Sequence, residues 1–178
     1  MGVEENSLLR MRREGLGCLL CDTSGGYCIV ITMSAEIVIR LTKPSDYASV
    51  HALVQTIADE TFANLFASQV PIGEANWDSA WLAVLGEEIV GVTKTQDMWV
   101  SDLWVRRDHR RTGIGGRLLA QAESEIRSRG HNALHLRVVK SNTRAVEFYR
   151  NHAWRVHREF PHEKFGHPMF EMIKSSEL

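Results

Sequence analysis

The stretch LWVRRDHRRTGIGG at residues 103–116 decides the fold, because an apolar strand pattern changes within it to a basic loop and then to a glycine-rich helix start. Four arginines and three glycines follow Val105 in this stretch. Glycine lets backbone N–H groups approach a ligand closely, and the unpaired N–H groups and positive dipole end of a helix attract anions. The stretch therefore predicts a phosphate-binding turn between a strand and a helix.

Two common phosphate-binding motifs do not match this turn. A Walker loop needs lysine and then serine or threonine after its last glycine, whereas Arg117 and Leu118 follow Gly116. The dinucleotide fingerprint needs a third glycine where Leu118 stands. ATP and NAD are therefore not favoured as ligands.

Hydrophobic periodicity on both sides of the turn predicts strands and helices. Before the turn, strands are expected over 37–41, 81–85, 89–95 and 98–105, and helices from Pro44 onwards and over 62–66. After it, helices are expected from Gly113 to Gly130 and after Asn142, and strands over 134–138, 154–158 and 169–173. Strands and helices alternate only in the second half, so the sheet should be mixed, with a β-helix-β crossover after Val105.

Three motifs follow one another at separations that are typical of one family. They are Leu103-x-Val105, Arg110-x-x-Gly113-x-Gly115 and Asn142-x-x-Ala145-x-x-Phe148-Tyr149. Over residues 36–173 the chain resembles the GNAT superfamily of N-acetyltransferases. The resemblance implies an α/β (mixed α+β) fold, in which about four helices flank a mixed, mostly antiparallel sheet of six to seven strands with a splayed parallel pair at the cofactor site. Ala153 departs from the glycine that relatives usually have there, and a left-handed backbone would cost alanine about 1 kcal/mol more.

The same resemblance implies acetyl-CoA as co-substrate, and no metal. The backbone of Leu103 and Val105 would bind the pantetheine arm, and the Asn142 side chain would contact the cofactor. The turn residues of the cofactor site would be Arg110, Arg111, Thr112, Gly113, Ile114, Gly115 and Gly116. Tyr149 would protonate the leaving thiolate, for which a phenol with a pKa of about 10 is suited. Two alternatives stay open, in which Asn142 only caps a helix and Tyr149 only packs in the core.

The general base does not follow from the resemblance. Many relatives place a catalytic carboxylate where this chain has Trp99 or Arg137, and neither side chain can take a proton from an ammonium group. Asp102 is the preferred candidate, with a strand-edge or turn-bonding aspartate as the alternative. Glu60 and His109 are further candidates.

These observations favour an enzyme that moves the acetyl group of acetyl-CoA directly to a primary amine of a small molecule or peptide, in a ternary complex. The alternative is a non-catalytic acyl-CoA-binding or regulatory module on the same fold, because Trp99 and Arg137 replace the usual carboxylates. Asp102 and Glu60 favour a cationic small-molecule acceptor. Relatives often pair, so a homodimer is expected.

Length and composition agree with one soluble domain. The chain has 178 residues, 44% of them hydrophobic and 24% charged, which is enough to bury a core. Its 21 basic and 22 acidic residues give a formal charge of −1, which does not favour nucleic acid as a partner. The absence of a run of about 18 apolar residues argues against a membrane span. We expect a cytoplasmic protein with one N-acetyltransferase domain at 35–178 and an N-terminal extension at 1–34.

Cysteine and histidine spacing does not predict a metal site. Cys18 and Cys21 have C-x-x-C spacing, but no second pair follows them. Four histidines recur at intervals of five, which does not place them on one face of a helix. These are His152, His157, His162 and His167. The first residues resemble a signal peptide only weakly, and we expect Met33 to be the natural start.

Overall fold

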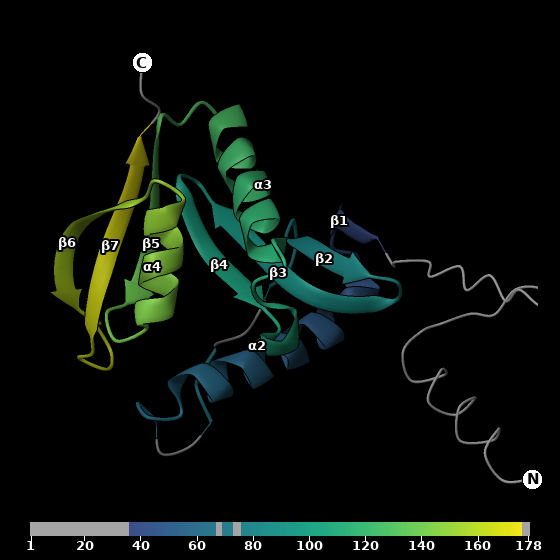
Figure 1. Ribbon diagram of the computed structural model, residues 1–178, viewed down its shortest axis with the longest axis horizontal. Helices are drawn as coiled ribbons and strands as arrows, with labels where there is room; N and C mark the ends of the chain where they lie inside the picture. The colour runs from purple at the N-terminus through teal and green to yellow at the C-terminus, as the bar shows by residue number, and fades with distance from the viewer. Residues whose placement is uncertain (1–35, 67–68, 73–75, 176–178) are drawn as a thin grey trace, which may run out of the picture. The chain divides into compact units, whose positions relative to one another are not determined.

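The computed structural model describes residues 36–66, 69–72 and 76–175 (Figure 1). Its strands are β1 (Ile37–Leu41), β2 (Trp81–Leu85), β3 (Glu88–Gln96), β4 (Trp99–Val105), β5 (Ala133–Val139), β6 (Arg155–Pro161) and β7 (Pro168–Ser175). Its helices are α2 (Tyr47–Phe62), α3 (Ile114–Ser128) and α4 (Thr143–Asn151), with short 3₁₀ helices η1 (Pro44–Asp46) and η2 (Arg107–His109). The predictions for Cys18, Cys21 and Met33 fall outside the described residues.

Every predicted strand is present, but the predicted helix over 62–66 is wrong. The amides of Leu65 and Phe66 both donate to the carbonyl of Phe62, so this segment is the closing turn of α2. The described residues therefore form three α-helices instead of about four. No helix among them is long and apolar enough to span a membrane.

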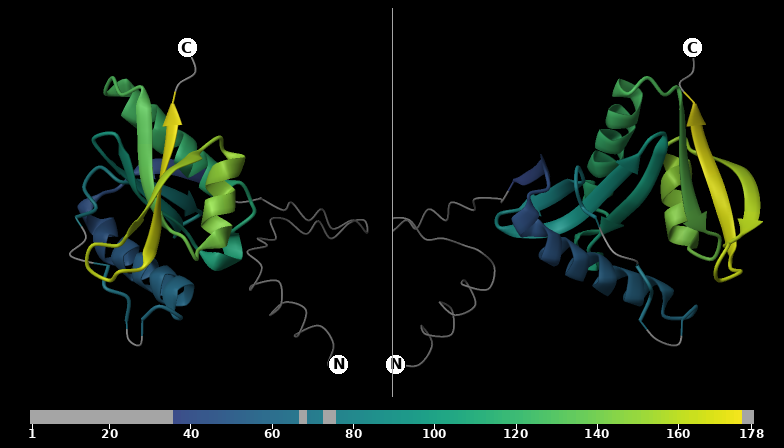
Figure 2. Two further views of the ribbon diagram at one scale, coloured as in Figure 1. Left: turned by 90° about the vertical axis from the view of Figure 1, so that its left-hand side faces the viewer. Right: turned by 180° about the vertical axis from the view of Figure 1, so that it is seen from behind.

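The seven strands form one mixed sheet in the order β1-β2-β3-β4-β5-β7-β6. Neighbouring strands run antiparallel except β4 and β5, which are parallel because α3 provides the crossover between them. Helices α3 and α4 lie in front of the sheet in Figure 1, and α2 lies in front of it in the rear view of Figure 2. The expected mixed sheet with a crossover is thus confirmed.

Each face of the sheet carries its own part of the core. On one face, Val50 and Val54 of α2 pack against Leu82, Val84 and Val92. On the other face, the apolar stripe of α3 covers β2 to β5, as its helical spacing predicted. The buried residues of this stripe are Ile114, Leu118, Leu119, Ala122 and Ile126. The two layers hold β4 from both sides.

A β-bulge interrupts β4 at Ser101. Thr95 of β3 is level with Val100, whereas Lys94 is level with Asp102, so Ser101 is the extra residue. A bulge bends its strand and increases the local twist. It also shifts the alternation of side chains by one, so that residues after Ser101 exchange faces.

The parallel pair separates at this bulge. β4 and β5 pair only at Trp99 with His135 and at Val100 with Leu136, and beyond these two positions the strands diverge (Figure 1). The splayed parallel pair that the resemblance implied is therefore confirmed. One edge of β4, from Ser101 onwards, has no strand beside it.

A buried carboxylate connects α3 to the far end of the sheet. Glu123 is only 6% exposed, and its oxygens accept hydrogen bonds from the indole N–H of Trp154 at 2.9 Å and from Lys174 Nζ at 2.7 and 2.9 Å. Trp154 follows α4 and Lys174 lies in β7. A buried charge is tolerated only when it is paired in this way. Glu123 thus holds three elements together.

We predict that Glu123→Ala lowers the free energy of unfolding by about 3 kcal/mol, because Trp154 loses a buried acceptor and Lys174 its partner. Glu159→Ala is the matched control, since Glu159 pairs with Lys140 at the surface and should cost less than about 1 kcal/mol. Urea unfolding of both variants measures the difference. Equal decreases in the free energy of unfolding of the two variants would contradict the proposed role of Glu123 in holding α3, Trp154 and β7 together.

Helix α4 ends in a left-handed residue that is not glycine. Ala153 has φ of 65°, its amide donates to the carbonyl of Arg150, and the amide of Trp154 donates to that of Tyr149. These two bonds form a Schellman motif, in which glycine is the preferred residue. The left-handed backbone considered for Ala153 is therefore present.

Ala153→Gly should raise the free energy of unfolding by up to about 1 kcal/mol, because removal of the left-handed strain exceeds the added entropy of glycine in the unfolded chain. The converse variant is Gly130→Ala, because Gly130 has φ of 91° and an added Cβ there would meet no atom within 4 Å. Gly130→Ala should lower the free energy of unfolding by a similar amount. A destabilised Ala153→Gly protein in denaturant titrations would refute this account.

Candidate functional site

The predicted phosphate-binding turn has a geometry that suits an anion. Gly113 has φ of 86° and caps the start of α3, and a Cβ added to it would meet nothing within 4 Å. The first amides of a helix have no carbonyl partner within that helix, so those of Ile114, Gly115 and Gly116 stay available. Arg111 is also left-handed, with φ of 67°. The turn therefore presents free N–H groups around open space.

Side chains of the turn hold it in shape. Arg110 Nε donates to the carbonyl of Val105 at 3.0 Å, and Thr112 Oγ1 donates to the carbonyl of His109 at 2.7 Å. Burial lowers the pKa of Arg110, the positive charges of Arg144 and Arg107 lower it further, and the negative charge of Glu60 opposes them in part. This clustering of like charges favours an anion beside the turn.

Gly115 and Gly116 have a second role, which the sequence did not indicate. An added Cβ on Gly115 would lie 3.4 Å from the ring of Phe148, and one on Gly116 would lie 3.1 Å from His152 Nε2. Both partners belong to α4 or its C-terminal cap. These glycines therefore let α4 pack closely against the start of α3.

The backbone of Leu103 and Val105 faces the opening between β4 and β5. The amide of Arg106 donates to the carbonyl of Val90, so Val105 occupies a non-hydrogen-bonded position opposite β3. By the same alternation, Leu103 also turns its N–H and C=O away from β3. The Arg110 bond to the Val105 carbonyl lies on this side. Leu103 therefore offers its N–H and C=O where the predicted pantetheine arm would lie, and Val105 offers its N–H, because its carbonyl accepts from Arg110.

A cleft of about 670 Å³ begins where the two strands separate. Four predicted site residues line it together: Asp102, Leu103, Asn142 and Tyr149. Its apolar and aromatic wall comes from the end of α2 and the turn after it, from β6 and from the segment between β6 and β7. This wall includes Phe62, Leu65, Phe66, Phe160 and Phe165. The sequence did not reveal this wall, because its residues are far apart in the chain.

Tyr149 is buried in this cleft, with 8% of its surface exposed. Burial raises the pKa of its phenol above the usual 10, and the negative charge of Asp102 raises this pKa further. The phenol is therefore protonated at neutral pH and can act as a proton donor. Its ring also contacts Phe148 and Trp154, so the packing role that was kept as an alternative exists as well.

Asp102 lies immediately after the bulge and shares the face of β4 that carries Trp104. Its Oδ1 accepts a hydrogen bond from Trp104 Nε1 at 3.0 Å, which leaves Oδ2 for a ligand. Asp102 is partly buried. The bulge thus turns a carboxylate into the cleft at the point where the strands separate.

Asn142 is the N-terminal cap of α4. Its Oδ1 accepts a hydrogen bond from the amide of Ala145 at 3.2 Å. The helix-cap alternative is therefore confirmed as one role of this residue. Because Asn142 also lines the cleft, its amide Nδ2 remains available as a donor.

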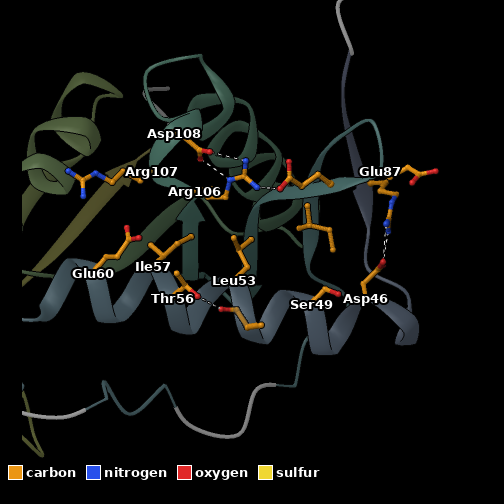
Figure 3. Close-up of a pocket in the computed structure, with 14 residues that line it drawn as sticks. Asp46, Ser49, Leu53, Thr56, Ile57, Glu60, Glu87, Arg106, Arg107 and Asp108 are labelled. Carbon is orange, nitrogen blue, oxygen red and sulfur yellow. Dashed lines mark hydrogen bonds and ion pairs between the residues drawn. The ribbon is translucent and has the colours of Figure 1, made fainter. Parts of the chain in front are cut away.

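Two candidate bases lie elsewhere. Glu60 lines a separate cavity of about 1,030 Å³ between α2 and the η2 segment, where Arg106 is paired with Asp108 and Glu88 (Figure 3). His109 Nε2 lies 2.7 Å from a guanidinium nitrogen of Arg106. The set of residues that lines the cleft with Tyr149 includes neither of them.

Two of the regularly spaced histidines, His162 and His167, line the cleft. His162 Nδ1 accepts hydrogen bonds from the amides of Lys164 and Phe165, and His167 packs edge-on against Phe66. Within the described part of the chain, no three His, Cys, Asp or Glu side chains are grouped to hold a metal ion. These histidines shape the loop between β6 and β7.

The fold is shared with several solved acetyltransferase structures. YncA from Salmonella typhimurium, solved with acetyl-CoA, is 16% identical, with a TM-score of 0.64 over 81% of this chain and 96% of its own. PaiA N-acetyltransferase from Thermoplasma acidophilum, solved with coenzyme A, is 16% identical, with a TM-score of 0.61 over 79% and 99%. The ribosomal-protein-S18-alanine N-acetyltransferase of Escherichia coli is 17% identical, with a TM-score of 0.57 over 80% and 96%.

Sequence comparison gives the family directly. No curated protein matches this chain in sequence. The model of the Acetyltransferase (GNAT) family matches residues 50–154, which include the turn, the separated strands and the tyrosine helix. With the fold and these motifs in agreement, the chain belongs to the GNAT acetyltransferase family.

Proposed function

We propose that the protein is an N-acetyltransferase that moves the acetyl group of acetyl-CoA directly to the primary amine of a small molecule, with both substrates bound at once. The observation that carries this proposal is the opening between β4 and β5. Tyr149 and Asp102 line the cleft at that opening, next to the free edge of β4. A proton donor and a carboxylate therefore adjoin the backbone that would hold the cofactor.

The residues on the cofactor side suit acetyl-CoA. The open space at Gly113 and the free amides from Arg111 to Gly116 suit a pyrophosphate, which is a compact dianion. The outward-facing backbone of Leu103 and Val105 suits the amide groups of the pantetheine arm. Asn142 Nδ2 can donate to the same arm. Acetyl-CoA would supply an activated thioester, so the protein needs no covalent intermediate.

The residues of this chain would provide two proton transfers. The carboxylate of Asp102 attracts the ammonium group of the acceptor and takes its proton, which frees the lone pair for attack on the acetyl carbon. As the carbon–nitrogen bond forms and the carbon–sulfur bond breaks, the Tyr149 hydroxyl gives its proton to the departing sulfur. The nitrogen then loses its second proton, which restores the Tyr149 phenol, and the proton on Asp102 leaves to solvent. The raised pKa of Tyr149 keeps this proton in place until that step. Positioning by the cleft supplies the remaining rate enhancement.

We predict that Gly113→Asp lowers acetyl-CoA affinity at least about tenfold, because it adds negative charge where the pyrophosphate would bind. The control is Gly130→Asp, at the other end of α3. Gly130 has φ of 91° and the same open surroundings, so its backbone strain is matched. Calorimetric titration with acetyl-CoA measures both variants. Unchanged affinity in folded Gly113→Asp protein would exclude this turn from the cofactor site.

We predict that Tyr149→Phe reduces the rate of acetyl transfer about 10- to 10⁴-fold while acetyl-CoA affinity stays unchanged, because only the proton donor is lost. Tyr47→Phe is the control, since Tyr47 bonds Asp78 outside the cleft. Thiol detection of released CoA measures the rate. A folded Tyr149→Phe protein with full turnover would show a packing role only.

The same assay separates the enzyme from a non-catalytic acyl-CoA-binding module. A panel of primary amines is supplied with saturating acetyl-CoA, and the release of free CoA is followed. Release that depends on the amine supports an enzyme. Tight acetyl-CoA binding without release for every amine would favour the module.

A further inference from the structure

Arg137 stands at the β5 wall of the cleft, where many relatives have a carboxylate. Its guanidinium carbon lies 5.0 Å from the centre of the Trp99 ring and 5.4 Å from that of the Phe160 ring. These rings come from β4 and β6, so two strands hold the cation from both sides. The arrangement positions a charged side chain firmly at the mouth of the opening.

The carboxylate nearest in register does not neutralise this cation. Glu171 of β7 is paired with Arg137 across the sheet. Its Oε2 accepts from Arg158 at 2.7 and 2.8 Å, and its Oε1 contacts His135 at 3.1 Å. Burial opposes the ionisation of Glu171, but these bonds outweigh burial and lower its pKa. The carboxylate is thus charged and already fully engaged.

Arg137 therefore has no ion pair within the described part of the chain. A guanidinium has five N–H donors in a planar fork that matches a carboxylate in two parallel hydrogen bonds. Stacking on aromatic rings uses the faces of the guanidinium and leaves the N–H edge available. An exposed fork held in this way is suited to bind an anionic group that enters the cleft.

Opposite charges lie on the two walls of the opening. Asp102 belongs to β4 and Arg137 to β5, and both line the same cleft. An ammonium group attracted by Asp102 and a carboxylate bound by Arg137 together describe a zwitterion. The surrounding aromatic wall from α2 and the segment after β6 suits an apolar substituent. The cleft volume of about 670 Å³ is in the range of a small-molecule site.

We infer that the acceptor is a free amino acid with an apolar side chain, whose carboxylate is bound by Arg137. This inference rests on the proposed function and names its substrate class. It replaces the cationic acceptor expected from Asp102 and Glu60, because Glu60 lies in the other cavity and Arg137 adds a positive charge. A peptide N-terminus has an amide instead of this carboxylate and would leave Arg137 unpaired.

The first experiment measures binding without turnover. N-acetyl-L-phenylalanine and N-acetyl-L-phenylalaninamide are titrated calorimetrically into the full chain saturated with coenzyme A. We expect the acid to bind at least about tenfold more tightly than the amide, because only the acid can form the paired bonds. Arg137→Gln should abolish this preference, and Arg137→Lys should retain part of it. Lys164→Gln is the control, because it removes a nearby cation that does not line the cleft.

Equal binding of acid and amide would overturn the inference and favour a peptide acceptor. An acid preference that survives in folded Arg137→Gln protein would also overturn it, and thermal melts establish that the variant is folded. Failure of the acid to bind at millimolar concentration would do the same. Loss of the preference in Lys164→Gln would reduce the effect to general electrostatics and overturn the specific role of Arg137.

The second experiment compares turnover of L-phenylalanine with that of phenethylamine, which lacks the carboxylate. We expect kcat/KM at least about tenfold higher for the amino acid, and equal values in Arg137→Gln. If phenethylamine is acetylated as well as phenylalanine, the inference fails while the proposed function stands. If the acid binds through Arg137 but no amine releases CoA, the proposed function fails while the carboxylate site stands.

Discussion

The separation of β4 from β5 is the constraint on which the rest of the site depends. A sheet is most stable when neighbouring strands form hydrogen bonds along their whole length. The parallel pairing of β4 and β5 nevertheless ends after Val100 and Leu136. One extra residue, Ser101, causes this by bending β4. The bulge leaves the edge of Leu103 and Val105 unpaired and turns Asp102 into the opening. Cores on both faces of the sheet hold β4 in this bent shape.

The glycines at the helix start beside this opening differ in what surrounds them. Gly113 needs a left-handed backbone and open space, which suit an anion. Gly115 and Gly116 lie against Phe148 and His152 of the neighbouring helix and its cap. A Cβ on Gly116 would lie 3.1 Å from His152 Nε2, so the His152 ring would have to move slightly, whereas a Cβ on Gly115 would just touch the Phe148 ring at 3.4 Å. The start of α3 and the helix that carries Tyr149 are thus in close contact.

The cleft carries opposite charges on its two walls, Asp102 on β4 and Arg137 on β5. Glu171 is shared by Arg158 and His135, so Arg137 keeps its hydrogen-bonding edge for a ligand. Asp102 faces the same space from the other strand, with one oxygen bonded to Trp104. The cleft therefore contains one negative and one positive side chain, Asp102 and Arg137, next to its aromatic wall. Such a site discriminates by pairing, since a ligand that lacks one of the two charges forms one ion pair instead of two.

The sequence by itself determined the order of strands and helices, the turn at Gly113 and the cap at Asn142, because periodicity, left-handed glycine and helix capping are local properties. It also placed Tyr149 and Asp102 among the candidates. Only the tertiary structure decided that Ser101 is a bulge, that Glu60 belongs to another cavity and that Glu171 leaves Arg137 free. Each of these depends on register and contacts between residues far apart in the chain, which no local pattern records.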